Sequence, residues 1–244
     1  MTKMQNRIFS VDSPKAIKAR AYGYLNAIHY LAPADLAGVG DLCPFRSIGC
    51  TKACLGWESG QAAMVSADHL MNSIRLSRIA KAKRFMSDRK AYLHDMWVSI
   101  SKLVSLAIKL GLKLCVRLNG SSDISWESIK YDGFTMMEWF PEVQFVDYTK
   151  NPNRALRHAA GLLPRNYHLT FSRHEHNRLD CISILQACGT VAVVFENKPE
   201  TWEGFPCVDG DKHDLIHTVP KGHVIALSPK GRKAKADTSG FVVR

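Results

Sequence analysis

Short apolar segments alternate with longer amphipathic segments along most of the chain. Near-continuous apolar runs of about four to eight residues, rich in β-branched and aromatic side chains, predict buried strands. The strands predicted in this way are 113–118, 143–149, 167–172 and 191–196, with weaker candidates at 204–210 and 223–228. The longer segment 21–33 is predicted as the first strand, although its pattern is also compatible with a helix.

The segments between these strands carry apolar residues at spacings of three and four, as on one face of a helix. The predicted helices are 60–87, 89–110, 151–163 and 176–188. Strands that alternate with helices in this way indicate a parallel sheet with helices packed on it. We therefore expect an α/β fold, with about six or seven parallel strands in an incomplete or irregular (β/α) barrel, or failing that a doubly wound sheet.

The composition, 46% hydrophobic and 23% charged, is that of a folded protein rather than a disordered one. No linker divides the chain, so we expect one domain over residues 1–244, ending in a flexible basic tail at 229–244. No apolar run approaches the roughly 20 residues of a membrane span, and the polar N-terminus does not resemble a secretory signal. We therefore expect no membrane partner and a reducing cytoplasm, where clustered cysteines more often bind metal or do chemistry than form disulfides.

Polar residues follow five successive predicted strands, where parallel sheets place their chemistry. The predicted catalytic residues among them are Asp123, Asp147, Lys150 and Arg173. The predicted cofactor-binding residues are Asn119, Ser122, Ser172, Glu196, Asp209 and Asp211. Together they indicate a lined cavity, with simple helix N-capping as the alternative for Asp123 and Ser172.

Three cysteines, Cys43, Cys50 and Cys54, lie within twelve positions of the loop 41–61, directly after the first predicted strand. Structural zinc takes four ligands, usually as two close pairs, and the chain has no second close pair. A catalytic thiolate needs one cysteine and a base rather than three thiols. Three thiolates suit an iron–sulfur cluster with one iron left open, so we favour this interpretation, with zinc and no metal as alternatives.

The spacing within the loop refines that interpretation. Radical S-adenosylmethionine enzymes carry three cluster cysteines at the corresponding place, spaced C-x3-C-x2-C, whereas the spacings here are six and three residues. A three-cysteine cluster is therefore favoured over a standard radical-SAM loop, and [4Fe–4S] over [3Fe–4S]. S-adenosylmethionine stays a candidate ligand of the open iron.

The positive charge is unevenly distributed. Residues 1–122 hold 18 Lys and Arg against 7 Asp and Glu, whereas residues 123–244 hold 15 against 15. Much of the excess lies in 75–90, which is predicted as a basic helix. The alternative function is therefore a basic nucleic-acid-binding module with a structural metal site, and a solvated helix is the simplest explanation of the charge.

The chain resembles a family of uncharacterised bacteriophage and prophage proteins, akin to the phage "gene product eighty-eight" group. The resemblance is carried by motifs that span nearly the whole chain: YLNAIHYLAPA, LCPFRSIGCTKACL, SDRKAYL, VRLNGSSDISWE, FVDYTKNPNRAL, NYHLTFSRHE, VAVVFENK, PETWEGFPCVDGDKHDL and KADTSGFVV. It implies an iron–sulfur cluster on a radical-SAM-like partial barrel, in the cytoplasm of an infected or lysogenic host. The family's cysteine loop matches at Cys43, Cys50 and Cys54, and family members often carry a nonpolar residue in place of Cys207.

These observations lead to one functional hypothesis. The protein is expected to hold an iron–sulfur cluster whose open iron faces a polar pocket, and to carry out redox or radical-SAM-like chemistry. Its partner would be a small-molecule substrate or a redox protein, with nucleic acid as the partner in the alternative function.

Overall fold

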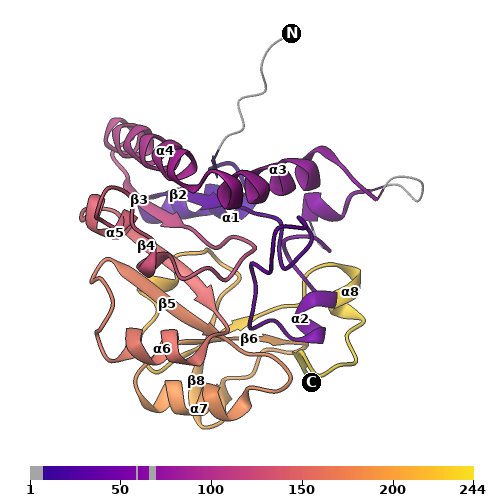
Figure 1. Cartoon of the computed structure of the whole chain (residues 1–244). Helices are drawn as coiled ribbons and strands as arrows, with labels where there is room; N and C mark the ends of the chain where they lie inside the picture. The colour runs from indigo at the N-terminus through magenta and orange to yellow at the C-terminus, as the bar shows by residue number, and fades with distance from the viewer. Residues whose placement is uncertain (1–7, 59, 66–69) are drawn as a thin grey trace.

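The computed structural model describes residues 8–58, 60–65 and 70–244. Within these residues the strands form one ten-stranded sheet, ordered β1-β2-β3-β4-β5-β6-β9-β8-β7, with β10 also paired to β6 (Figure 1). The strands are β1 (Phe9–Ser10), β2 (Tyr24–His29), β3 (Lys113–Arg117), β4 (Gln144–Thr149), β5 (Tyr167–Ser172), β6 (Val191–Phe195), β7 (Thr201–Trp202), β8 (Phe205–Asp209), β9 (Val224–Leu227) and β10 (Val242–Val243). Among the described strands only the β1–β2 and β7–β8 pairs are antiparallel, so the predicted α/β fold with a mostly parallel sheet is confirmed.

The predicted barrel is not confirmed, because the sheet is open. Its order begins at β1 and ends at β7. A barrel requires the first and last strands to pair. Here each edge is instead a two-residue strand that runs antiparallel to its neighbour. Such short edge strands limit further pairing at the ends of an open sheet.

Helices connect the parallel strands. They are α1 (Pro14–Ala19), α2 (Ile48–Lys52), α3 (Ser73–Ser87), α4 (Arg89–Lys109), α5 (Met136–Trp139), α6 (Pro152–Ala159), α7 (Arg178–Gln186) and α8 (Gly231–Lys235), with 3₁₀ turns at Arg20–Tyr22, Gly60–Ala63, Trp126–Ser128 and Ile216–Thr218. Of the predicted helix 60–87, residues 66–69 lie outside the described residues and α3 begins at Ser73, where the Asn72 side chain caps it by accepting from the backbone N–H of Arg75. None of the described helices is both long and apolar enough to cross a bilayer.

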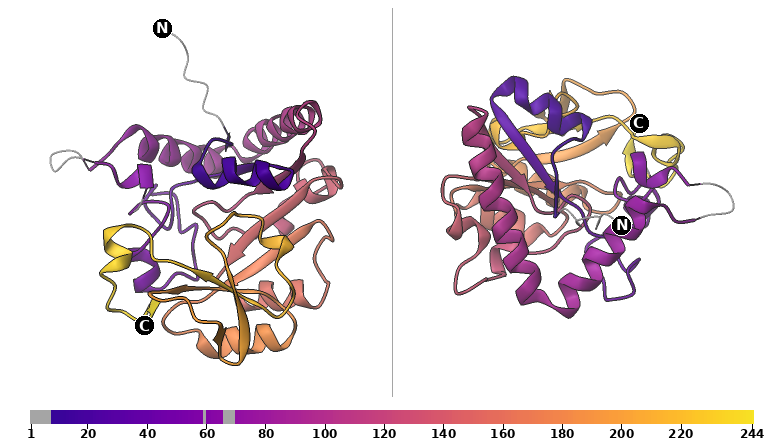
Figure 2. Two further views of the ribbon diagram at one scale, coloured as in Figure 1. Left: turned by 180° about the vertical axis from the view of Figure 1, so that it is seen from behind. Right: turned by 90° about the horizontal axis from the view of Figure 1, so that it is seen from above.

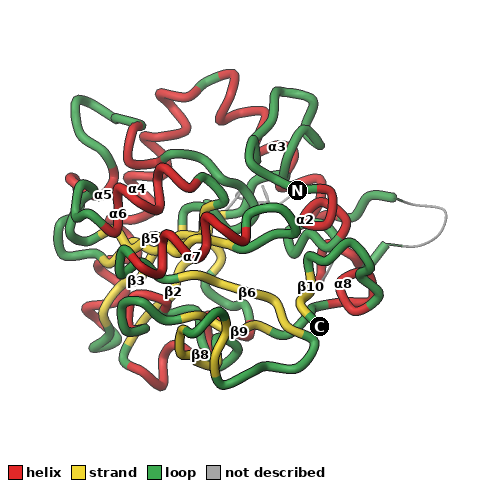
Figure 3. Tube along the Cα trace, turned by 90° about the horizontal axis from the view of Figure 1, so that it is seen from below, coloured by secondary structure: helices red, strands yellow, loops and turns green. Residues whose placement is uncertain are grey.

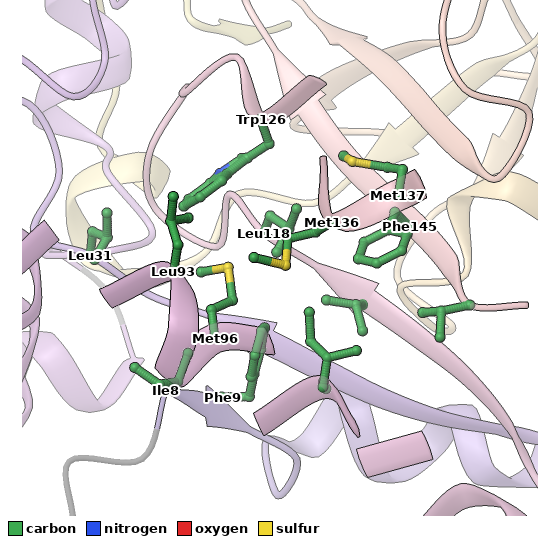
Figure 4. Packing of buried hydrophobic residues seen from close by; sticks show 14 of the residues in the cluster. Ile8, Phe9, Leu31, Leu93, Met96, Leu118, Trp126, Met136, Met137 and Phe145 are labelled. Carbon is green, nitrogen blue, oxygen red and sulfur yellow. The ribbon is translucent and has the colours of Figure 1, made fainter. Parts of the chain in front are cut away.

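Alternate residues of the strands point to opposite faces of the sheet, and both faces are covered. On β3, Leu114 and Val116 join the large core beneath α3 and α4, whereas Cys115 joins a smaller cluster on the other face with Ala19 of α1. The α3–α4 pair lies at the opposite end of the molecule from α6 and α7 (Figure 2). Figure 4 shows the large core, in which Trp126 lies above Leu93 and Met96.

The C-terminal segment packs against the cysteine loop. Residues 229–244, predicted as a flexible tail, contain α8 and the strand β10, and α8 lies beside α2 (Figure 3). Asp237 is buried and accepts hydrogen bonds from Ser239 Oγ and the backbone N–H of Val242. These contacts attach residues 229–244 to the rest of the fold. The predicted flexibility of this segment is a separate property and stays a prediction.

Candidate functional site

The cysteine loop leaves β2 and lies over the carboxyl ends of the central strands. Cys50 lies on α2, with Cys43 before that helix and Cys54 after it. Ser47 caps α2 by accepting from the backbone N–H of Cys50. The carboxylate of Glu175, in the loop after β5, accepts from Ser47 Oγ at 2.6 Å and from the backbone N–H of Gly49 at 2.7 Å. The helix that carries Cys50 is thereby fixed to the carboxyl end of the sheet.

A cavity of about 200 Å³ lies between the loop and the strand ends. All three cysteines line it, together with five of the predicted strand-end residues. These five are Asn119, Ser122, Asp123, Lys150 and Ser172. The structure thus brings the cysteine loop and the ends of β3, β4 and β5 to one cavity.

All three cysteines are half-buried, and burial affects the thiols of Cys43 and Cys54. Burial raises the pKa of Cys43 to about 12 and that of Cys54 to about 11, and negative charge on neighbouring cysteines adds to both increases. Burial would lower the pKa of Lys150, but Cys50 and Asp123 raise it above its ordinary value. The Lys150 ammonium also donates to Ser172 Oγ at 3.1 Å. A cation is therefore fixed beside the cysteines, where thiolate charge would otherwise be unfavourable.

The remaining predicted residues lie outside the cavity wall. Asp147 is buried beneath Asn119, accepting from the Asn119 backbone N–H at 2.6 Å and from Tyr167 Oη at 2.9 Å. Burial raises the pKa of this carboxyl to about 7. Arg173 turns to the C-terminal segment and donates to the carbonyls of Gly240 and Phe241. Both side chains support the residues around the cavity.

The other three predicted residues form ion pairs near the β8–β7 end of the sheet or at the chain end. Glu196 Oε1 lies 3.6 Å from Arg244 Nε. Asp209 and Asp211 both pair with Lys198 Nζ, at 2.5 and 2.6 Å. Their cofactor-binding role, predicted from position after a strand, has no support from this placement.

An ion-pair network anchors the loop after β3. Arg154 on α6 is 4% exposed, and its guanidinium binds Glu127 through two hydrogen bonds of 2.7 and 2.8 Å. Its Nη1 donates to Asp123 Oδ1 at 2.7 Å, while Asp123 Oδ2 accepts from the backbone N–H of Lys150. Asp123 is thus a bridge between the ends of β3 and β4 as well as part of the cavity wall.

Several cavity residues were not predicted from the sequence. They are Arg46, Arg117, Tyr148, Asp214, Lys230 and Phe241. Arg117 and Tyr148 lie within predicted strands, and the available signal was a charged or polar side chain at the last positions of an otherwise apolar run. Asp214 belongs to the polar segment VDGDKHD, and Phe241 lies in the segment predicted as a tail.

The family resemblance implies an iron–sulfur cluster, for which the three cysteines would be the donors. Among the described residues, no group of three or more Cys, His, Asp or Glu side chains could hold a metal ion as arranged. One tetrahedral ion draws its thiolates to within about 4 Å of one another, whereas a cluster spreads them over separate irons. Three thiols on one cavity wall, with a neighbouring ammonium, fit a cluster in their chemistry.

Gly56 allows the loop to approach the strand ends closely. A Cβ atom at Gly56 would lie 2.2 Å from Ser121 Cβ, so any larger residue forces the loop and the β3 end apart. We expect Gly56→Ala to lower the free energy of unfolding by about 1–3 kcal/mol, as other overpacked sites do. The double variant G56A/S121G should recover at least half of that loss in denaturant unfolding, with S121G alone as the control. Equal instability of G56A and G56A/S121G would contradict this explanation.

Comparison with known proteins gives one match. No curated protein and no solved structure matches the chain. The model of the family described as Gene product 88 matches residues 7–244, and this confirms the predicted relationship to a phage-type family. Since the match covers nearly the whole sequence, the chain belongs to the Gene product 88 family.

Proposed function

We propose that this protein is an iron–sulfur protein in which Cys43, Cys50 and Cys54 ligate the cluster. The observation that carries the proposal is the position of all three thiols on the wall of one cavity at the carboxyl ends of parallel strands. Ligand and substrate sites of open parallel sheets lie at this edge. A [4Fe–4S] cluster held by three cysteines keeps one iron without a protein thiolate, and that iron would face the polar wall.

The chemistry of the surrounding residues supports a cluster over structural zinc. The other four cysteines, Cys115, Cys181, Cys188 and Cys207, do not line the cavity. A structural zinc site would need a fourth protein ligand close to these three thiols, and the Asp123 carboxylate on the same wall already accepts from Arg154 and from the backbone N–H of Lys150. A cluster with an open iron needs no fourth protein ligand. The Lys150 ammonium beside Cys50 would offset part of the cluster's negative charge.

The chain itself would bind the cluster, orient the substrate and shield the site. When bound, the cluster supplies one-electron chemistry, either as a redox centre or in radical-SAM-like reactions with S-adenosylmethionine as a candidate ligand. The loop with α2 covers one side of the cavity, and its hydrogen bonds to Glu175 hold it there. Ser122 donates its hydroxyl hydrogen to Asn119 Oδ1 and can only accept from a small-molecule substrate, whereas Ser172 accepts from Lys150 and can donate to one.

The surroundings of the basic helix α3 favour the cluster over the nucleic-acid alternative. Arg75 is 6% exposed and donates to the carbonyls of Trp57, Ala62 and Leu70. Lys81 is also buried, and burial lowers its pKa to about 8. Part of the charge that suggested a phosphate-binding surface is therefore used inside the protein, and a nucleic-acid partner stays a prediction.

Metal analysis of anaerobically purified protein tests the proposal. We expect iron and acid-labile sulfide in near-equal amounts, with broad absorbance near about 400 nm from the sulfur-ligated iron. Electron paramagnetic resonance, recorded with and without S-adenosylmethionine, would distinguish three-iron from four-iron clusters and report binding at the open iron. Stoichiometric zinc without sulfide would refute the proposal.

A further inference from the structure

Arg117 occupies a different part of the cavity from the cysteines. It is the last residue of β3, and its side chain is 16% exposed. Its charged and aromatic neighbours are Asp214 and Tyr148, whereas the Lys150 ammonium donates to Ser172 Oγ at the end of β5. The cavity therefore has a cysteine end, marked by Lys150, and an arginine end, marked by Arg117.

The guanidinium of Arg117 has more N–H groups than the described residues accept hydrogen bonds from. Among the described residues it donates one hydrogen bond, from Nε to the carbonyl oxygen of Asn119 at 3.2 Å. Asp214 Oδ2 lies 3.8 Å from Nη1, which is ion-pair distance but longer than a hydrogen bond. The Tyr148 ring lies 4.6 Å from the guanidinium carbon and holds the group in place. Arg117 lines the cavity, so its outer N–H groups are available to an acceptor placed there.

Part of the wall near the C-terminal segment is apolar, beside the polar side chains of Ser228 and Lys230. The apolar part is formed by Val194 of β6, Leu227 of β9, Ala234 of α8 and Phe241. Apolar side chains that line a cavity beside a few fixed polar groups are typical of small-molecule sites. A ligand in this cavity would thus meet a charged group at one end and hydrocarbon along its body.

We propose that the arginine end of the cavity binds a small molecule with an oxyanion, either a carboxylate or a phosphate, on a compact apolar body. Arg117 pairs with the oxyanion through its planar fork, and the apolar wall contacts the body. Lys150, on the same cavity, adds positive charge. This inference rests on the proposed function, because it names the substrate class of the cluster site.

Isothermal titration calorimetry of the full-length protein tests the inference with three probes of matched body: benzoate, phenylphosphate and the neutral benzamide. Losing the charged hydrogen bonds should weaken binding, so we expect benzamide to bind about tenfold or more weaker than the better anion. Tighter benzoate identifies a carboxylate ligand, and tighter phenylphosphate identifies a phosphate ligand. Equal binding of all three probes overturns the inference.

Two variants connect this preference to Arg117. R117Q/D214N removes both charges of the pair, so no lone charge stays buried, and should abolish the preference for the anions. R117K keeps the charge but loses the planar fork, and should weaken the better anion by a smaller factor. The matched control R178Q/E203Q removes an exposed Arg–Glu pair elsewhere and should bind as the wild type does. Wild-type affinity in both Arg117 variants overturns the inference.

Iron and sulfide, measured on the same samples, separate this inference from the proposed function. Protein without a cluster that prefers the anions supports the oxyanion site and refutes the cluster. Protein with a cluster that binds the three probes equally refutes the oxyanion site and leaves the cluster in place.

Discussion

Replacing Cys50 by Ser is expected to remove the iron–sulfur absorbance of the anaerobically purified protein and most of its bound iron. Cys50 is the central cysteine of the loop, carried by α2 on the cavity wall beside Lys150. A cluster held by three thiolates has no spare ligand, and a serine hydroxyl is a poor substitute because it stays protonated near neutral pH. Absorbance, iron and sulfide per chain, and the electron paramagnetic resonance signal measure the loss.

Two cysteines outside the cavity provide matched controls. Cys188 is exposed before β6, and Cys207 is half-buried on β8. Cys188→Ser and Cys207→Ser should retain the spectrum and iron content of the wild type. Circular dichroism should show C50S folded, since Cys50 is only half-buried and its backbone contacts with Ser47 remain. A folded C50S protein with full absorbance would refute Cys50 as a ligand.

The position of the cysteine loop was predictable from the sequence because it depends on local patterns. Apolar runs identified the central strands of the sheet, and in a parallel arrangement all their carboxyl ends meet at one edge. Residues that directly follow a strand, such as Ser122 and Asp123, reach the cavity from there. The loop after β2 reaches it for the same reason.

Side-chain direction was not predictable in the same way, because it is decided by partners distant in sequence. Asp147 is inside β4 and turns to Asn119 and Tyr167, and Arg173 follows β5 but turns to the C-terminal carbonyls. Arg117 was missed because a charged residue at the end of an apolar run looks like the boundary of a strand. Its role depends on Asp214, almost a hundred positions later.

The open sheet and the buried basic residues have a similar explanation. Two-residue edge strands such as β1 and β7 are too short to produce a periodic pattern, so the sequence could not distinguish an open sheet from a barrel. A charged residue on a predicted helix is read as solvated. Arg75 is instead buried because the carbonyls of the preceding loop need its donors.

Replacing Arg154 by Met is expected to cause the largest loss of stability among single substitutions around the site, about 3–5 kcal/mol in the free energy of unfolding. The substitution leaves Glu127 and Asp123, whose side chains are 2% and 10% exposed, without their shared cation. Two neighbouring carboxylates away from water would repel each other and lose their hydrogen bonds. Denaturant unfolding measures the loss, and the cluster content should fall with it because Asp123 also holds the end of β4.

A triple variant distinguishes the cost of unpaired charge from the cost of lost packing. In D123N/E127Q/R154M the two acids are neutral, so much of the lost stability should return if unpaired charge is the cause. Arg178→Met breaks the ion pair with Glu203. The Arg178 side chain is 58% exposed, so the substitution should leave the unfolding midpoint unchanged. If the triple variant is no more stable than R154M, the guanidinium acts mainly by filling space between α6 and the loop after β3. If it recovers, the ion pair is what fixes Asp123 at the cavity wall, and the cluster content should recover only in part, because an amide at position 123 accepts more weakly than a carboxylate from the backbone N–H of Lys150.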